Sequence, residues 1–266
     1  MIDPRLIAAV ETLIAAHARP GHVPLIAIAG SQGSGKTTLA RAVAARTGAA
    51  HLSLDDVYLT RVERAVLART VHPLFGTRGP PGTHDLGLLD RVIAALAAAG
   101  PDARTALPAF DKLADDRLPP EVWPVFAGRP TAILLDGWCL GARPQGEAAL
   151  AAPINALERD RDADGRWRRA ANDQLAGPYR ARFDRFDALL FLRAPAFAVV
   201  LDWRCEQEAG LRGLAPADLP AAERARLAGF IGYFERITRS MIAGGVDADV
   251  VVSLDRERRP LAIATG

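Results

Sequence analysis

The stretch Gly30-Ser31-Gln32-Gly33-Ser34-Gly35-Lys36-Thr37 follows an apolar run, Val23–Ala29, and leads into residues with helical spacing. It fits the pattern G-x-x-x-x-G-K-[ST] between a strand and a helix, the context in which this pattern binds phosphate. Its glycines let the loop wrap with its backbone N–H groups turned inward, and the helix beginning near Lys36 adds its positive dipole end. The sequence therefore predicts a strand–loop–helix unit that grips the phosphates of a nucleoside triphosphate.

Individual side chains of this loop have distinct expected roles. Lys36 can reach the β- and γ-phosphates, and the hydroxyl of Thr37 is placed to bind Mg²⁺. The predicted nucleotide-binding residues are Gly30, Ser31, Gln32, Gly33, Ser34, Gly35, Lys36, Thr37 and Thr38.

The composition of the 266-residue chain is typical of a globular protein with a substantial core, with 50% hydrophobic and 24% charged residues. A formal net charge of +2 gives no electrostatic argument for a nucleic-acid partner. Cys139 and Cys205 do not suggest a disulfide framework and fit a reducing compartment.

Residues 1–18 have apolar side chains at helical spacing, interrupted by the charges of Asp3, Arg5 and Glu11. A secretory signal needs an uninterrupted apolar region, and a membrane span needs ~18 or more apolar residues. We therefore expect an N-terminal helix, a cytoplasmic location and no membrane partner, and the oligomeric state stays open.

Apolar runs and helical spacings alternate along the rest of the chain. The predicted strands are Val23–Ala29, His51–Leu54, Arg104–Leu107, Thr131–Gly137, Ala188–Leu192 and Asp249–Leu254. The predicted helices are Lys36–Arg46, Arg61–Thr70, Asp85–Gly100, Phe197–Leu211 and Pro220–Ala243. This alternation predicts one α/β domain, residues 1–266, with a mostly parallel sheet and helices on both faces. The charged run Arg159–Arg169 is interpreted as a solvated face.

Carboxylates follow two of the predicted strands, at the sheet edge where ligands of such folds bind. Asp136 is expected to help hold Mg²⁺, and the alternative is a residue that only begins a turn. One of Asp55 and Asp56 is expected to meet the acceptor hydroxyl, because neighbours on a strand edge point in opposite directions. The alternative for this pair is a helix N-cap.

Cationic side chains in the loops suggest an anionic substrate, since guanidinium groups bind carboxylates in bidentate fashion. These loop residues are Arg78, His84, Lys112 and Arg117. Further along, Arg204, Glu208 and Arg212 have i, i+4 spacing, which fits a surface ion-pair ladder. It also fits a lid, at about residues 197–215, whose arginines close on the transferred phosphoryl group.

Together these motifs resemble those of the D-glycerate 3-kinases of plant and fungal type and their bacterial relatives. The shared segments are the phosphate loop, Leu52–Thr60, Arg78–Asp85, Pro108–Lys112, Leu135–Gly141 and Trp203–Glu208. This family lies within the P-loop kinases that include phosphoribulokinase, uridine kinase and pantothenate kinase. The resemblance extends from about Val23 to Pro260 and is most specific in Arg78–Asp85.

The resemblance implies a P-loop kinase-type three-layer sandwich that uses ATP and Mg²⁺. It implies a catalytic carboxylate at Asp55 and a metal-associated acid at Asp136, where many members have Glu. The predicted catalytic residues are Lys36, Asp55, Arg204 and Arg212, with Thr37 and Asp136 at the metal. The predicted substrate-binding residues are Asp56, Tyr58, Arg78, His84, Asp85, Lys112 and Arg117. The usual Y-D-K-S segment reads Phe110-Asp-Lys-Leu113 here.

The expected activity is transfer of the γ-phosphoryl group of ATP to an alcohol, with D-glycerate as the first choice of small-molecule acceptor. A nucleoside, pantothenate or other metabolite kinase is the nearest alternative. Aromatic residues that could stack on a nucleobase keep this alternative open: Tyr58, Phe75, Phe110 and Trp138. A nucleotide-dependent switch or assembly factor is a further alternative, although no N-K-x-D guanine-reading motif is visible.

Overall fold

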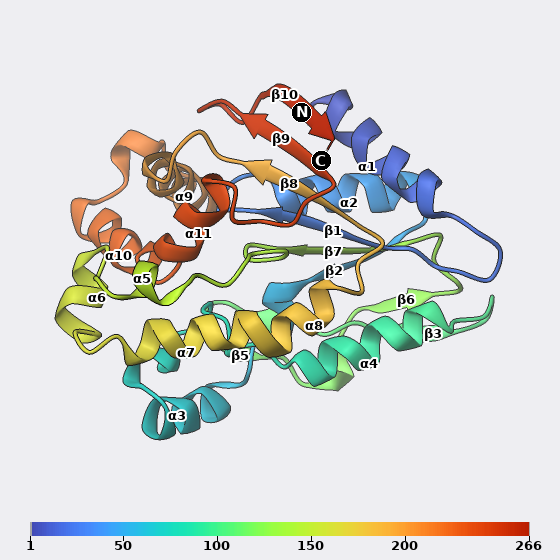
Figure 1. Cartoon of the computed structure of the whole chain (residues 1–266). Helices are drawn as coiled ribbons and strands as arrows, with labels where there is room; N and C mark the ends of the chain where they lie inside the picture. The colour runs from blue at the N-terminus through green and yellow to red at the C-terminus, as the bar shows by residue number, and fades with distance from the viewer. Residues whose placement is uncertain (1, 266) are drawn as a thin grey trace.

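A computed structural model of the chain describes residues 2–265. The central sheet contains β1 (Leu25–Gly30), β2 (Ala50–Ser53), β7 (Ile133–Gly137), β8 (Ala188–Arg193), β9 (Val250–Leu254) and β10 (Pro260–Thr265). Its strand order is β10-β9-β8-β1-β7-β2, and every neighbouring pair is parallel except β9 and β10 (Figure 1). Two small antiparallel pairs lie outside it: β3 (Arg104–Ala106) with β6 (Val125–Ala127), and β4 (Phe110–Asp111) with β5 (Asp116–Arg117).

Helices surround the sheet in the described part of the chain. They are α1 (Pro4–His17), α2 (Lys36–Thr47), α3 (Arg61–Thr70), α4 (Leu86–Ala97), α5 (Glu147–Leu150), α6 (Ala156–Arg161), α7 (Arg166–Gln174), α8 (Arg180–Phe183), α9 (Ala198–Leu211), α10 (Ala221–Ile231) and α11 (Glu235–Ile242). Short 3₁₀ turns and one π-helical turn, Leu175–Tyr179, connect them.

Strand β1 is buried on both faces, which explains its unbroken apolar sequence. Leu25 and Ala27 join a core cluster with side chains of α4 and α11, whereas Ile26 and Ile28 join a cluster with α1, α2 and α9. The alternation follows from the two-residue period of a strand. The predicted α/β fold with helices on both faces of a mostly parallel sheet is therefore confirmed.

Most predicted elements form within two or three residues of their expected bounds. The predicted N-terminal helix is α1, and Met1 lies outside the described residues. Gly48 ends α2 with a left-handed φ of 76°, and Thr60 begins α3 with a capping box to Glu63. Residues 104–106 do form a strand, but it pairs with β6 outside the central sheet.

Two predictions about the C-terminal part are wrong. The expected helix Pro220–Ala243 is divided into α10 and α11, because the chain turns after Ile231 and places Phe234 edge-on against Trp138. Strand β9 is not the final strand, since β10 follows it as an antiparallel edge. β10 is largely exposed although its sequence, Pro260-Leu-Ala-Ile-Ala-Thr265, is mostly apolar, and so short an apolar run does not by itself distinguish a strand from a helix.

The charged run Arg159–Arg169 is not simply a solvated face, which corrects the interpretation from sequence. Within it Arg168 and Asp162 are buried and paired, with 2.9 Å between Nη1 and Oδ2. Glu158, next to the run, is also buried and accepts two hydrogen bonds from Arg236 of α11, at 2.7 and 2.6 Å. These pairs attach α6 and α7 to the rest of the structure.

Over residues 2–265, each helix is too short or too polar to cross a lipid bilayer.

Candidate active site

The phosphate loop lies at the carboxyl end of β1 and continues into α2. Gly33 and Gly35 have φ angles of 74° and 93°, in the left-handed region that favours glycine. A Cβ atom on Gly33 would also lie 2.6 Å from Cβ of Trp203 in α9. The backbone conformation and the close approach of α9 both require glycine at this position.

Within residues 2–265, buried side-chain atoms of this loop lack partners, and the two serine hydroxyls among them can donate to a bound phosphate, whereas the glutamine carbonyl oxygen can only accept. Among the described residues, Ser31 Oγ, Gln32 Oε1 and Ser34 Oγ are buried without a hydrogen-bond partner. Buried polar atoms normally have a partner, so three unpaired atoms in one loop indicate a site for a polar ligand. Lys36 Nζ lies 3.4 Å from the Ser31 carbonyl oxygen, a weak bond that a phosphate oxygen can replace.

Thr37 and Asp136, the residues expected at the metal, are brought together. Thr37 Oγ1 donates to Asp136 Oδ1 at 3.0 Å, and the Asp136 side chain is only 1% exposed. A hydroxyl and a carboxylate oxygen are hard ligands of the kind that Mg²⁺ prefers. His51 Nε2 lies 2.7 Å from Asp136 Oδ2, and Ser53 Oγ donates to Oδ1 at 3.3 Å. His51 was not predicted from the sequence, where only its place in the short strand Ala50–Ser53 distinguishes it.

Asp55 and Asp56 lie in a 3₁₀ turn, Leu54–Val57, and not on a strand edge. The expectation that they point in opposite directions therefore rests on the wrong geometry. The alternative helix N-cap role is also wrong, because Thr60 caps α3. Asp56 Oδ1 accepts a long hydrogen bond of 3.4 Å from the Phe110 backbone N–H. Burial and the charge of Asp55 raise the pKa of Asp56 to about 6.

The Asp55 carboxylate is held by two side chains from different segments. Tyr58 Oη donates to Oδ1 at 2.8 Å, and Lys112 Nζ donates to Oδ2 at 2.7 Å. Burial acts to raise the pKa of Asp55, but the charges of Lys112 and Lys36 and these hydrogen bonds together hold it well below its usual value. Asp55 is therefore ionised at neutral pH, and the charge of Lys36 in the phosphate loop helps to stabilise its carboxylate.

His84 is buried against Tyr58, with 4.6 Å between the stacked rings. Its Nδ1 bonds the hydroxyl of Tyr179, and its Nε2 has no partner among the described residues. Burial lowers the pKa of His84 to about 3, so the ring is neutral at physiological pH. Tyr58, His84 and Lys112, predicted from separate motifs, thus gather around Asp55.

Arg78, Asp85 and Arg117 have partners within the protein. Arg78 forms an ion pair with Asp115, and its guanidinium lies 5.5 Å from the centre of the Phe110 ring. Asp85 caps α4, and its other oxygen accepts from Arg117 Nη1 at 3.1 Å. These contacts fix the loops around the site.

The loop of residues 78–85 lacks regular structure but is closely cross-linked. The Gly79 N–H donates to Thr83 Oγ1 at 3.0 Å, and Trp138 Nε1 donates to the Gly79 carbonyl at 3.0 Å. Gly79 has a φ of 122°, and a Cβ atom there would lie 2.3 Å from the Phe234 ring. Loop 78–85 is therefore held in one conformation by the core.

Arg204 and Arg212 both pair with Glu208, at 3.2 and 3.0 Å, and Arg212 also pairs with Glu223 of α10 at 2.8 Å. The ion-pair ladder expected as one alternative is present. Arg204 is the more buried of the two, and burial lowers its pKa despite the charge of Glu208. In this conformation Arg204 is paired within α9, and Arg212 is paired with both α9 and α10.

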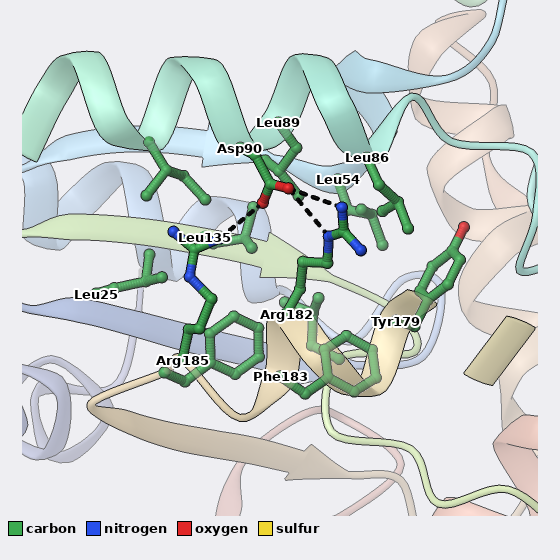
Figure 2. Close-up of a pocket in the computed structure, with 13 residues that line it drawn as sticks. Leu25, Leu54, Leu86, Leu89, Asp90, Leu135, Tyr179, Arg182, Phe183 and Arg185 are labelled. Carbon is green, nitrogen blue, oxygen red and sulfur yellow. Dashed lines mark hydrogen bonds and ion pairs between the residues drawn. The ribbon is translucent and has the colours of Figure 1, made fainter. Parts of the chain in front are cut away.

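An apolar pocket lies between α4 and the segment from Tyr179 to Phe186, behind the site (Figure 2). Leucines of the core line it, and Asp90 on its rim pairs with Arg182 and Arg185 at 2.8 and 2.9 Å. Tyr179 borders this pocket while its hydroxyl bonds His84. The pocket is part of the packing that positions Tyr179.

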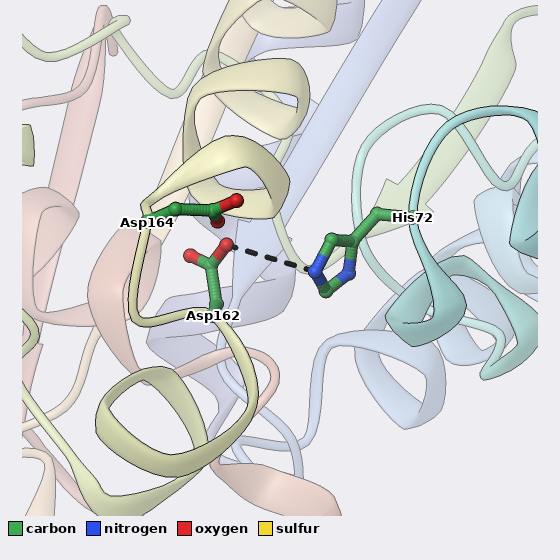
Figure 3. A group of neighbouring side chains, drawn as sticks. All are labelled: His72, Asp162 and Asp164. Atoms are coloured by element: carbon green, nitrogen blue, oxygen red, sulfur yellow. Dashed lines mark ion pairs between the residues drawn. The ribbon is translucent and has the colours of Figure 1, made fainter.

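His72, Asp162 and Asp164 form a small cluster away from the phosphate loop (Figure 3). His72 Nδ1 accepts a hydrogen bond from the Leu74 N–H. Asp162 Oδ1 accepts from the Trp167 N–H, and its Oδ2 accepts from the backbone and side chain of Arg168. Because both Asp162 oxygens already accept hydrogen bonds from α7, Asp162 is a structural junction between α6 and α7, and His72 Nε2 lies 3.9 Å from its Oδ1.

Comparisons with known proteins agree with this geometry. A D-glycerate 3-kinase of Arabidopsis thaliana, described as chloroplastic, is 27% identical over 256 residues, which covers 89% of this chain. The chain spans about half of that relative's length, 54%. The solved structure of a D-glycerate 3-kinase from Cryptococcus neoformans superposes with a TM-score of 0.78 at 21% identity, covering 99% of this chain and 98% of that one. The chain therefore has the same overall fold as this fungal D-glycerate 3-kinase.

A second solved structure, the protein YGR205w, has a TM-score of 0.70 at 19% identity and covers 98% of each chain. No protein-family model matches the chain. The resemblance to D-glycerate 3-kinases inferred from the motifs is confirmed.

Proposed function

We propose that the chain is an ATP- and Mg²⁺-dependent kinase that phosphorylates an alcohol group, with D-glycerate converted to 3-phosphoglycerate as the reaction. The observation that carries the proposal is the position of Asp55. Its carboxylate is ionised and is stabilised by the positive charge of Lys36 in the phosphate loop. It accepts hydrogen bonds from Lys112 and Tyr58. A phosphoryl-transfer site needs such a carboxylate to orient the attacking hydroxyl.

Each group has a defined role in this proposal. The loop amides and Lys36 hold the β- and γ-phosphates of ATP, and Thr37 and Asp136 hold the metal ion, which neutralises phosphate charge when bound. Asp55 orients the acceptor hydroxyl and takes its proton late in the transfer, since a carboxylate with a depressed pKa is a weak base. Arg204 or Arg212 stabilises charge on the transferred group after α9 moves, as a lid over residues 197–215.

The acceptor is inferred from the similarity to D-glycerate 3-kinases and from the side chains near Asp55. Lys112 Nζ contacts Asp55, and Arg78, which pairs with Asp115, donates from Nη2 to the Lys112 backbone carbonyl oxygen at 3.3 Å, so two cationic side chains suited to a carboxylate come from adjoining loops. The aromatic rings that favoured a nucleoside alternative are all buried in the protein's own packing: Tyr58, Phe75, Phe110 and Trp138. They present little surface for stacking on a base, which favours a small anionic acceptor.

The proposal treats the chain as a single kinase domain, because both core clusters share the central sheet. It includes a cytoplasmic location, which agrees with two free and buried thiols, Cys139 and Cys205. It requires a small-molecule partner and no nucleic acid or membrane.

An acceptor panel tests the proposal. ADP release is measured with D-glycerate, L-glycerate, glycerol, pantothenate and uridine, and ³¹P NMR identifies the phosphorylated carbon. We expect D-glycerate to be strongly preferred and Lys36→Met to be inactive. Preference for uridine or pantothenate would establish the metabolite-kinase alternative. ATP hydrolysis that no acceptor stimulates would instead favour the nucleotide-dependent switch.

A further inference from the structure

Arg258, in the turn between β9 and β10, reaches the phosphate loop from outside. Its Nε donates to the Gly33 carbonyl oxygen at 2.6 Å, and its Nη2 donates to Glu206 of α9 at 2.6 Å. Its guanidinium also lies 5.1 Å from the ring centre of Trp203, a cation–π distance. One side chain therefore joins the β9–β10 turn, α9 and the phosphate loop.

The backbone of Arg258 supports a specific role. Its φ is 65°, in the left-handed region that non-glycine residues rarely occupy. Such strain persists only where surrounding contacts hold it, and it is concentrated at functional sites. Trp203 adds to these contacts, because its Nε1 donates to the Arg256 carbonyl at 2.7 Å and fixes the turn against α9.

The bond to the Gly33 carbonyl determines the direction of the next amide. In a trans peptide the C=O of one residue and the N–H of the next point to opposite sides. With the Gly33 oxygen bonded to Arg258, the Ser34 N–H lies on the opposite side of the peptide and donates to the Ser31 carbonyl oxygen at 3.3 Å, a long hydrogen bond that a phosphate oxygen can replace. Inward amides are what let such a loop bind phosphate.

We propose that Arg258 is a positioning residue for nucleotide binding, which holds the Gly33–Ser34 peptide with its amide turned toward the phosphates. This inference rests on the nucleotide-binding part of the proposed function and not on the identity of the acceptor. Glu206 aligns the guanidinium, so α9 and the phosphate loop are coupled through one side chain. A charged donor lost from this peptide weakens ATP binding about tenfold or more.

The test measures the ATP dissociation constant by calorimetry with Mg²⁺ and no acceptor. Arg258→Met removes the donors and keeps the aliphatic stem, whereas Arg258→Gly removes them and relieves the left-handed backbone. We expect both variants to bind ATP about tenfold more weakly than wild type, and Arg258→Lys to have an affinity between theirs and that of wild type. The urea unfolding midpoint of Arg258→Gly should be close to that of wild type. Arg259→Met is the matched control, because Arg259 is its exposed neighbour and pairs with Asp255.

Variants of Arg258 that bind ATP within about twofold of wild type would overturn this inference alone. An equal loss in Arg259→Met would also overturn it, because the effect would then belong to the charge of the turn. Failure of the wild-type protein to bind ATP would overturn the proposed function together with this inference. Normal ATP binding without transfer to D-glycerate would refute only the proposed acceptor.

Discussion

Replacing Asp55 by asparagine removes the negative charge and leaves the shape of the side chain nearly unchanged. The Asn Oδ1 can still accept from Tyr58, which now bonds Asp55 Oδ1 at 2.8 Å. The new amide would face Lys112, whose side chain is 59% exposed and can turn to solvent. Loss of an ion pair this exposed costs less than about 1 kcal/mol, so the variant should fold.

The effect on turnover should be far larger. A positioned group that accepts a proton contributes about 10²–10⁴-fold to rate, which corresponds to about 3–5.5 kcal/mol in the barrier. We therefore expect kcat of Asp55→Asn to fall by about 10²–10⁴-fold. ATP affinity should stay the same or improve, because a negative charge near Lys36 is lost.

The assay is coupled ADP release with D-glycerate, combined with calorimetry for ATP and urea unfolding. Asp111→Asn is the control, since Asp111 precedes Lys112, the partner of Asp55, and accepts only the backbone N–H groups of Leu113 and Ala114 among the described residues. A kcat of Asp55→Asn within about fivefold of wild type would remove Asp55 from the mechanism.

Three further predictions concern stability, pH and metal. Glu158→Ala leaves the buried charge of Arg236 unpaired and should lower the free energy of urea unfolding by about 3–5 kcal/mol. Glu147→Ala is the control: it removes an exposed ion pair with Arg169 and should lower the free energy of unfolding by less than about 1 kcal/mol. His84 is kept neutral in the folded protein, with its pKa lowered from 6.5 to about 3, so the stability that this provides is complete above pH 6.5 and is lost as the pH falls. By about pH 5 wild type should lose about 2 kcal/mol more than His84→Gln in urea unfolding, and parallel losses would contradict the shift. EDTA should abolish transfer, and Asp136→Asn should raise the Mg²⁺ concentration for half-maximal activity by about tenfold or more; an unchanged requirement would argue against Asp136 at the metal.

Features of the fold that form from residues close together in the sequence were predictable, because interactions among neighbouring residues determine them. The phosphate loop combines a buried strand, glycines with left-handed φ and a helix start within a few residues, so the pattern alone identifies it. By contrast, a glycine at position 232 is compatible with a continuous helix, and only the packing of Phe234 on Trp138 shows why the chain turns there. Strand β10 is a short edge strand whose apolar residues are mostly exposed, and an apolar run of this length does not by itself identify a strand.

The parts of the site that were missed depend on contacts between distant segments. Glu158 and Arg236 are 78 residues apart, and a charged residue beside other charges is expected to be exposed unless its partner is known. His51 and Arg258 lie outside the recognised motifs. Their importance depends on contacts that only the folded structure shows, with Asp136 for His51 and with the Gly33 carbonyl for Arg258. The turn at Asp55 likewise depends on the loops that pack over it.

The cross-linked loop 78–85 has a consequence for the thermodynamics of substrate binding. Its backbone is already fixed by Thr83, by Trp138 and by the contact of Gly79 with Phe234. A loop that is ordered beforehand loses little conformational entropy when its ligand arrives. Acceptor binding should therefore show a small entropic penalty, and affinity for even a very small acid can come from a few well-placed polar contacts.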